Sequence, residues 1–394
     1  MSNSICAPPS SRVAFVTGVN GISGHAIVEH LIRTPKSEWS RIFITSRKLP
    51  SNYWVDPRVT FIGIDFLDSQ EVIVEKMNAA CKDVTHAYFT SYVHNSDLSK
   101  LPEKNNPLFR NFLEAIDVTC PKLQRVCLQT GGKHYGVQFQ NFNTPCHEDS
   151  PRYDGPGSET IFYYQQEDNL FEIQKRRNTW HYNIIRPFGI IGFAPQFSGI
   201  NEALPIAQYF LICRELGQSP KWPGNINGYH RVDDQCYAPS IADLTVWATT
   251  QDHCKDEAFN HSNGDAIVWR FLWTMFAQYY HVPMDGSEAP SDDGKPQMEL
   301  VEWAQDKRVV WEGIVGKYGG NSESFQMHGF AMMNWLFCPR TPGAPFMSTA
   351  VKARRLGWDR IDDTYEAWLS TFRSYENAGV LPSPDSVPKT GHSN

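Results

Sequence analysis

Two adjacent tyrosines and one lysine have the side chains best suited to proton transfer or to stabilising a developing negative charge. Tyr163 and Tyr164 lie in a helix-like segment, and four residues after each stands an acid, Glu167 or Asp168. Because residues four apart share a helix face, a cationic partner must come from another segment, and Lys133 is the candidate. An ammonium near a phenol lowers the pKa of the phenol, so such a pair suits hydrogen-bond donation to a substrate oxygen. Helix spacing leaves open which tyrosine acts.

Three glycines spaced three residues apart indicate a phosphate-binding turn. Gly18, Gly21 and Gly24 follow the β-rich segment 13–17 and open an amphipathic segment that reaches about residue 33. In a dinucleotide-binding turn, the glycines permit a sharp bend, a close approach to the pyrophosphate and tight packing of helix on strand. The helix N-terminus then offers unpaired N–H groups to the phosphates. An ordinary tight turn is the alternative, but the position on the first strand of an alternating series favours nucleotide binding.

The end of the second strand-like segment favours NADP(H) over NAD(H). A carboxylate there would bind the ribose 2′-hydroxyl of NAD, whereas a cation accommodates the 2′-phosphate of NADP. The chain has Arg47 and Lys48 at this place and no acidic residue nearby. The planar guanidinium of arginine suits phosphate, although a solvated basic turn would have the same composition. Asp65, at the end of the third segment, is expected to contact the adenine or to cap the next helix.

Short β-rich segments alternate with helix-length segments through the first half of the chain. This pattern is typical of βαβ units, so we predict an α/β fold with a doubly wound parallel sheet. The expected strands are 13–17, 41–46, 59–65, 84–90, 125–130 and 181–185. Helix-like segments then dominate, which predicts a smaller, mainly helical C-terminal substrate region. The predicted domains are an NADP-binding domain at 1–186, a substrate region at 187–380 with about 229–262 returning to the sheet, and a disordered tail at 381–394.

The composition argues against several classes of protein. The chain has 394 residues with 36 basic and 43 acidic side chains, and its net charge of −7 disfavours nucleic-acid binding. The nine cysteines include no C-x-x-C spacing, so neither a disulfide framework nor a metal site is expected. His86 and His134 lack metal-ligand spacing and are expected to be hydrogen-bonded structural residues. With no apolar run long enough to span a membrane and no secretory signal, we expect a cytoplasmic protein without membrane contact.

Six motifs, in order between residues 17 and 265, together resemble one protein family. They are T-G-x-x-G-x-x-G at 17–24, D-V-T-H at 83–86, L-Q-T-G-x-K-H-Y at 128–135, F-Y-Y-x-x-E-D at 162–168, R-P-x-x-I-x-G-F-x-P at 186–195 and E-A-F-N-x-x-N-G-D at 257–265. The combination is similar to the progesterone 5β-reductase/iridoid synthase-like (PRISE) family of atypical extended short-chain dehydrogenases/reductases. The resemblance implies a Rossmann fold and an NADPH-dependent reductase of small hydrophobic α,β-unsaturated carbonyl compounds in specialised metabolism. It also suggests a homodimer.

The resemblance further implies roles for individual residues. Tyr164 and Lys133 would be the catalytic pair: hydride from NADPH adds to the β-carbon, Tyr164 donates a hydrogen bond to the enolate oxygen, and Lys133 supports the tyrosine. Tyr92 and Phe139 would contact the substrate. The cofactor-binding residues implied by local match are Gly18, Asn20, Gly21, Ile22, Gly24, Arg47, Lys48, Asp65, Phe66, Ser91, Gln129, Tyr164, Pro187 and Ile191.

Two other kinds of function are compatible with the same residues. A carbonyl reductase that delivers hydride to the carbonyl carbon would use the same pair, because both reactions place negative charge on the same oxygen. A redox-neutral cyclase or isomerase, or a nucleotide-binding regulatory protein, would keep the nucleotide without net reduction. The chain departs from the family around the expected substrate pocket. Tyr92 replaces a common tryptophan, and the sequence 136–139 replaces a G-P-F-type turn. The identity of the substrate therefore stays open.

Overall fold

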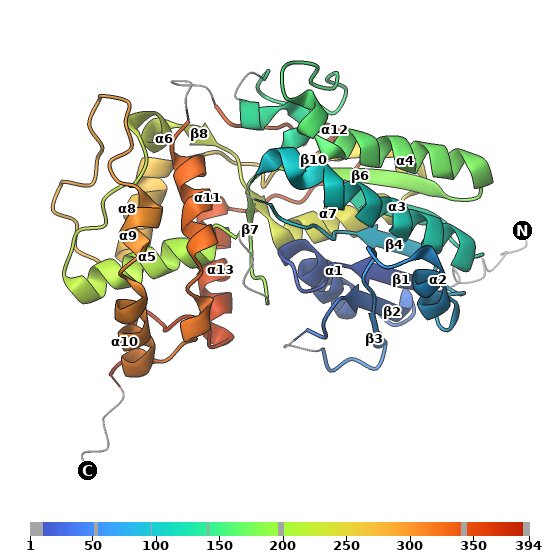
Figure 1. Ribbon diagram of the computed structural model, residues 1–394, viewed down its shortest axis with the longest axis horizontal. Helices are drawn as coiled ribbons and strands as arrows, with labels where there is room; N and C mark the ends of the chain where they lie inside the picture. Colours follow the sequence, from blue (N-terminus) through green and yellow to red (C-terminus); the bar gives the residue numbers. More distant parts are fainter. Residues whose placement is uncertain are drawn as a thin grey trace, which may run out of the picture. The chain divides into compact units, whose positions relative to one another are not determined.

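The computed structural model describes residues 11–50, 54–95, 97–139, 142–195, 201–339 and 345–388. The chain divides into two compact units, each built from discontinuous segments. Unit 1 comprises Met1–His134, Asp154–Arg186 and Ile241–Phe259, and unit 2 comprises Tyr135–Tyr153, Pro187–Ser240 and Asn260–Asn394. Figure 1 shows their helices and strands. Unit 2 therefore includes a segment from the first half of the chain that the sequence pattern does not set apart.

Unit 1 is built on a sheet with the strand order β10-β6-β5-β4-β1-β2-β3. Its strands are β1 (Arg12–Thr17), β2 (Trp39–Ser46), β3 (Val59–Gly63), β4 (His86–Phe89), β5 (Arg125–Gln129), β6 (His181–Pro187) and β10 (Glu257–His261). All neighbouring pairs from β3 to β6 run parallel. The strand order reverses between β1 and β4, which is where doubly wound sheets bind their ligands. The predicted α/β fold is confirmed, with strand ends shifted by a few residues.

Helices cover both faces of this sheet. They are α1 (Ile22–Arg33), α2 (Gln70–Asn78), α3 (Leu101–Thr119), α4 (Phe162–Arg177) and α7 (Ala238–Thr250). Against one face, Phe89 packs between Phe109 and Phe112 of α3, with ring centroids 4.8 and 4.9 Å away. On α7, the carbonyl of Thr249 lies 3.2 Å from His86 Nε2. His86 is thus a buried structural histidine, as predicted, and burial lowers its pKa to about 3.

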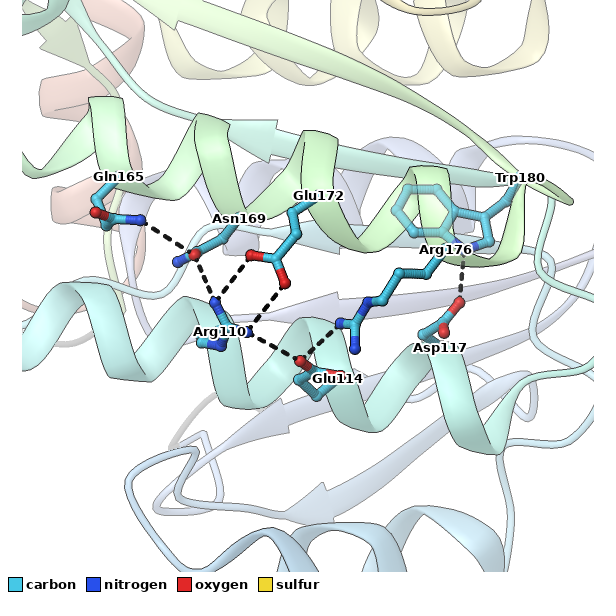
Figure 2. Close-up of polar contacts among 8 residues, drawn as sticks. All are labelled: Arg110, Glu114, Asp117, Gln165, Asn169, Glu172, Arg176 and Trp180. Atoms are coloured by element: carbon cyan, nitrogen blue, oxygen red, sulfur yellow. Dashed lines mark hydrogen bonds and ion pairs between the residues drawn. The ribbon is translucent and has the colours of Figure 1, made fainter.

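Helices α3 and α4 are joined by a network of polar contacts, shown in Figure 2. Arg110 of α3 donates to Asn169 of α4 at 2.9 Å and lies 3.3 Å from Glu172. One turn along α3, Glu114 pairs with Arg176 of α4 at 2.7 Å. Because these charged side chains are partly exposed, each pair contributes at most about 1 kcal/mol. Together they orient α4, the helix that carries the two tyrosines, against α3.

Unit 2 is mainly helical. Its helices are α5 (Ala203–Leu216), α6 (Ile226–His230), α8 (Trp269–Tyr279), α9 (Leu300–Ala304), α10 (Arg308–Tyr318), α11 (Met327–Phe337), α12 (Val351–Arg355) and α13 (Thr364–Asn377). Two short ladders pair β7 (Ile190–Ile191) with β9 (Cys236–Tyr237), and β8 (Val232–Asp233) with β11 (Ile267–Val268). Fully buried aromatic side chains, including Trp222, Trp273, Phe276 and Trp368, form its core. Within the described ranges, every helix is too short or too polar to cross a membrane.

The C-terminal segment packs on unit 2 before the described residues end. Leu381 is buried, and the Pro384 carbonyl accepts a hydrogen bond from Arg214 at 2.8 Å. The sequence predicts a disordered tail from residue 381, of which residues 389–394 lie outside the described part of the chain. That unit 1 binds the cofactor and unit 2 binds the substrate stays a prediction.

Candidate active site

The glycine turn between β1 and α1 leaves no room for side chains. Gly18 has a φ of 66°, and a Cβ there would lie 2.8 Å from the Thr90 carbonyl oxygen at the end of β4. A Cβ on Gly24 would lie 2.5 Å from the Gly18 carbonyl oxygen, because α1 starts directly against the turn. Gly21 precedes α1 and offers no side-chain cap to its first N–H groups. A turn without side chains, followed by helix N–H groups that no side chain caps, fits the pyrophosphate of a dinucleotide.

Asn20 connects this turn to the end of β2. Its side-chain nitrogen donates to Ser46 Oγ at 3.0 Å and to the Lys48 carbonyl oxygen at 2.9 Å. Arg47 and Lys48 are exposed, and neither forms a side-chain ion pair within the described ranges. The Asn20 bonds therefore hold the backbone that carries these two cations beside the glycine turn, and the predicted contact of Arg47 and Lys48 with the 2′-phosphate of NADP stays a prediction.

Asp65 and Phe66 follow β3. The carboxylate of Asp65 accepts a hydrogen bond from the Leu67 N–H at 3.0 Å, and α2 is preceded by Ser69 at its N-cap. Asp65 is therefore not the N-cap of α2, which was one of the two roles expected for it from the sequence. The ring of Phe66 is buried edge-to-face against Phe112, with centroids 5.4 Å apart, so its side chain serves the core.

Gln129 and two residues after β4 lie at the same edge of the sheet. The amide nitrogen of Gln129 donates to Ser23 Oγ in α1 at 2.7 Å, while its buried Oε1 has no hydrogen-bond partner within the described residues. Ser91 and Tyr92 are half-buried. Burial raises the pKa of Tyr92 to about 12, and its ring lies 5.9 Å from that of Phe162. A buried amide oxygen without a partner leaves an acceptor that a bound polar group could satisfy, and the predicted contact of Gln129 with the cofactor stays a prediction.

Of the two tyrosines, Tyr164 is the one whose hydroxyl reaches the segment containing Lys133. The hydroxyl donates to the His134 carbonyl oxygen at 2.5 Å, and the two rings stand edge-to-face with centroids 5.3 Å apart. Tyr163 instead packs on Phe162, with centroids 4.4 Å apart, and desolvation raises its pKa. The structure thus distinguishes two tyrosines that helix spacing left equivalent.

Lys133 lies in the 3-10 helix η2 (Gly132–Tyr135), just past the end of β5. Its side chain is half-buried, and desolvation lowers the pKa of its ammonium. In the described part of the chain, this ammonium forms neither a hydrogen bond nor an ion pair. A partly desolvated cation without a fixed partner can stabilise negative charge on a bound oxygen.

Phe139, Pro187 and Ile191 belong to unit 2. Phe139, in η3 (Val137–Phe139), stacks on Tyr153 with ring centroids 5.1 Å apart. Pro187 ends β6, and the fully buried Ile191 pairs with Tyr237 between β7 and β9. These contacts lie within unit 2, and the predicted contacts of the three residues with substrate and nicotinamide stay predictions.

Sequence reasoning missed a buried ionic cluster next to Tyr164. Glu167 Oε1 accepts a hydrogen bond from Arg186 at 2.9 Å and lies 3.2 Å from His134 Nδ1. The three side chains are 3%, 6% and 3% exposed, respectively. Burial alone would raise the pKa of Glu167, but the contacts with His134 and Arg186 outweigh it and lower the pKa to about 2. The one feature of the sequence that could have indicated this cluster is the three-residue spacing between Tyr164 and Glu167, which places both side chains on one face of the helix.

No group of three or more histidine, cysteine or carboxylate side chains that could hold a metal ion occurs among the residues that the structure describes.

Solved structures with the same fold include an enzyme in complex with a nicotinamide dinucleotide. The Bordetella bronchiseptica enzyme WbmH in complex with NAD+ has a TM-score of 0.61 at 15% identity, covering 92% of this chain and 99% of that one. A UDP-glucose 4-epimerase of Thermotoga maritima has a TM-score of 0.59 at 13% identity, covering 93% and 99%. Such low identities establish the fold alone. The fold, the glycine turn without side chains and the relatives of this chain together define an NAD(P)-dependent oxidoreductase of the short-chain dehydrogenase/reductase type.

Within that class, the chain belongs to the PRISE-like Rossmann-fold family, whose domain it matches over residues 14–382. A short-chain dehydrogenase of Penicillium aethiopicum is 42% identical over 94% of this chain and 99% of the relative. An (S)-8-oxocitronellyl enol synthase of Nepeta cataria is 31% identical over 92% of each chain. A 3-oxo-Δ(4,5)-steroid 5-beta-reductase of Arabidopsis thaliana is 29% identical over 92% of each chain. The family predicted from the motifs is confirmed.

Proposed function

We propose that this protein is an NADPH-dependent reductase of small hydrophobic α,β-unsaturated carbonyl compounds, acting in specialised metabolism. The observation that carries the proposal is the hydrogen bond from the Tyr164 hydroxyl to His134, the residue that follows Lys133. It brings a phenol and the segment bearing an unpaired ammonium together from separate parts of the chain. The names of two relatives, a 3-oxo-Δ(4,5)-steroid reductase and an enol synthase, describe chemistry at conjugated carbonyls and enols, and so support the same class of substrate.

In the proposed reaction, NADPH supplies the hydride that reaches the β-carbon of the substrate. Negative charge then develops on the carbonyl oxygen, and the Tyr164 hydroxyl donates a hydrogen bond to it. This hydroxyl exchanges its bond to the His134 carbonyl for one to the substrate. Lys133 stabilises the same charge through its ammonium, which the half-buried position makes more effective than it would be in water.

The other contacts predicted from the sequence complete the proposal. Arg47 and Lys48 bind the 2′-phosphate, and the backbone of Asn20, Gly21 and Ile22 lies along the pyrophosphate. The remaining contacts are Asp65 and Phe66 with the adenine, Ser91, Gln129, Pro187 and Ile191 with the ribose and nicotinamide, and Tyr92 and Phe139 with the substrate. The homodimer and the cytoplasmic location also stay predictions.

The test is to mix the purified protein with NADPH and a panel of enones, enals and saturated ketones, following absorbance loss at 340 nm and the products. We expect saturated carbonyl products from the conjugated compounds and no turnover of the saturated ketones. Allylic alcohols as products would indicate carbonyl reduction instead. Conversion of a substrate without NADPH consumption would indicate the redox-neutral alternative.

Replacing Arg47 by alanine is expected to weaken NADPH binding by at least tenfold and to leave NADH binding within twofold. A charge-assisted hydrogen bond contributes about 1.5–3 kcal/mol, and only NADPH carries the 2′-phosphate that accepts it. Titration of protein fluorescence with each nucleotide measures both affinities. Arg33→Ala is a matched control, since Arg33 is an exposed cation in the last turn of α1 and pairs with Glu29. Equal losses for NADPH and NADH would refute the 2′-phosphate contact.

A further inference from the structure

The mechanism above uses the backbone carbonyl of His134 but none of the buried side chains of Glu167, His134 and Arg186, although this cluster adjoins Tyr164 and follows Lys133. We propose that Glu167 is a positioning residue whose carboxylate, fixed by Arg186, orients His134 and thereby sets the places of the Tyr164 hydroxyl and Lys133. This inference deepens the proposed function and rests on it.

Residues from three sequence motifs meet at one carboxylate oxygen, Oε1 of Glu167. Tyr164 and Glu167 are three residues apart on α4, so both project from the same face of the helix. Strand β6, which leads to Arg186, runs parallel beside β5, which leads to His134. The guanidinium and the imidazole therefore approach Glu167 Oε1 from neighbouring strand ends, and the oxygen contacts both.

Residue 134 is the link between this cluster and the catalytic pair. Its side chain contacts Glu167 and packs against the Tyr164 ring, while its own carbonyl accepts the Tyr164 hydroxyl. Its N–H belongs to the peptide group that follows Lys133. A change in the side-chain anchor of His134 therefore turns the two peptide groups that flank this residue: the one after it accepts the Tyr164 hydroxyl, and the one before it adjoins Lys133.

The charges of the cluster suit this role. An unpaired buried carboxylate would be costly, but Arg186 and the Nδ1 side of His134 compensate Glu167 within the fold. Because contacts with His134 and Arg186 hold the pKa of Glu167 well below neutrality, the anchor keeps its charge at neutral pH. Arg186 and His134 both contact Glu167 Oε1, whereas the Lys133 ammonium forms no ion pair with this carboxylate in the described part of the chain.

The variant Glu167→Gln tests the proposal, because glutamine keeps the shape of the side chain and one oxygen acceptor but removes the charge. We expect kcat for enone reduction to fall about tenfold, since misplacement of a reacting group by a fraction of an ångström has an effect of this size. The KM for NADPH should stay within twofold, because the glycine turn is untouched. Glu172→Gln is the matched control: it removes the same charge from an exposed ion pair on the same helix (Figure 2) and should leave kcat unchanged.

A double-mutant cycle separates positioning from plain structural support. If Glu167 acts through Tyr164, adding Glu167→Gln to Tyr164→Phe should cause less than a twofold further loss of kcat. A full additional tenfold loss, or an unchanged kcat in Glu167→Gln alone, would overturn the proposal. Should Glu167→Gln fail to fold, His134→Gln takes its place in the cycle, since its amide can still donate to Glu167 while the ring against Tyr164 is lost.

Hydrogen exchange provides a readout that does not depend on the proposed reaction. The backbone amides of residues 131–134 should exchange faster in Glu167→Gln than in wild type, with the rest of unit 1 unchanged. Unchanged exchange at these amides would contradict the anchoring role even if wild type reduces enones. Faster exchange together with a wild-type protein that reduces no compound of the panel would support the anchoring geometry and refute the proposed function alone.

Discussion

Replacing Tyr164 by phenylalanine should lower kcat for enone reduction by about 10²–10³-fold, because loss of one donor to a developing oxyanion has an effect of this order. The affinity for NADPH should change by less than threefold. The phenyl ring keeps the edge-to-face packing on His134, and only the hydroxyl that donates to the His134 carbonyl is lost. Stopped-flow measurement of NADPH oxidation, with a separate nucleotide titration, checks both expectations.

Tyr163→Phe is the matched control for this variant. It removes the same hydroxyl one residue earlier, from a side chain that packs on Phe162 and has no hydrogen-bond partner in the described ranges. We expect its kcat to stay within twofold of wild type. Undiminished turnover in Tyr164→Phe, or an equal loss in both variants, would show that the proton donor has been assigned to the wrong residue.

The sheet and the glycine turn were predictable because local sequence determines them. Strands buried on both faces consist of continuous apolar runs, and helix-length segments between them require parallel neighbours. At Gly18 the positive φ and the Thr90 carbonyl leave glycine as the residue that fits, so the turn is visible as a residue type at a fixed spacing. Three of the family motifs, those at 17–24, 128–135 and 186–195, begin at the ends of β1, β5 and β6.

The different contacts of Tyr163 and Tyr164 and the buried ion pairs of Glu167 were not predictable from spacing. Helix periodicity places Tyr163 and Tyr164 about 100° apart, but it does not reveal which direction faces the end of β5. That depends on how α4 packs on α3 and on the strand order, both of which are long-range. Glu167 was noticed only as an acid near a tyrosine, because the guanidinium and imidazole that keep it charged lie 19 and 33 positions away in the sequence.

The extent of unit 2 has a similar explanation. Residues 135–153 begin six positions after the end of β5 at Gln129, and their composition resembles other loops of the first half of the chain. Their place is determined by contacts with distant segments, such as the hydrogen bond between the Tyr135 hydroxyl and Asn260 at 2.6 Å and the one between Cys146 N and the Met347 carbonyl at 2.9 Å. Contacts over such separations leave no periodic signal in a single sequence.

Replacing Gly24 by alanine is expected to abolish measurable NADPH binding and to lower the free energy of unfolding by about 1–3 kcal/mol, the usual effect of overpacking. A Cβ at this position would lie 2.5 Å from the Gly18 carbonyl oxygen and 2.8 Å from that of Thr17. Both are backbone atoms that cannot rotate away, so α1 must move off the turn. Its first N–H groups then no longer point at the pyrophosphate. Urea unfolding and nucleotide titration measure the two effects.

Gly313→Ala is the control, because this glycine lies within α10 with open space around the position of a Cβ. Alanine there should raise the free energy of unfolding by about 0.5–1 kcal/mol through helix propensity and leave NADPH binding unchanged. Normal NADPH affinity in Gly24→Ala would mean that the cofactor does not depend on the close approach of α1 to the turn. The assignment of the pyrophosphate to this turn would then be wrong, and with it the placement of the nicotinamide beside Tyr164.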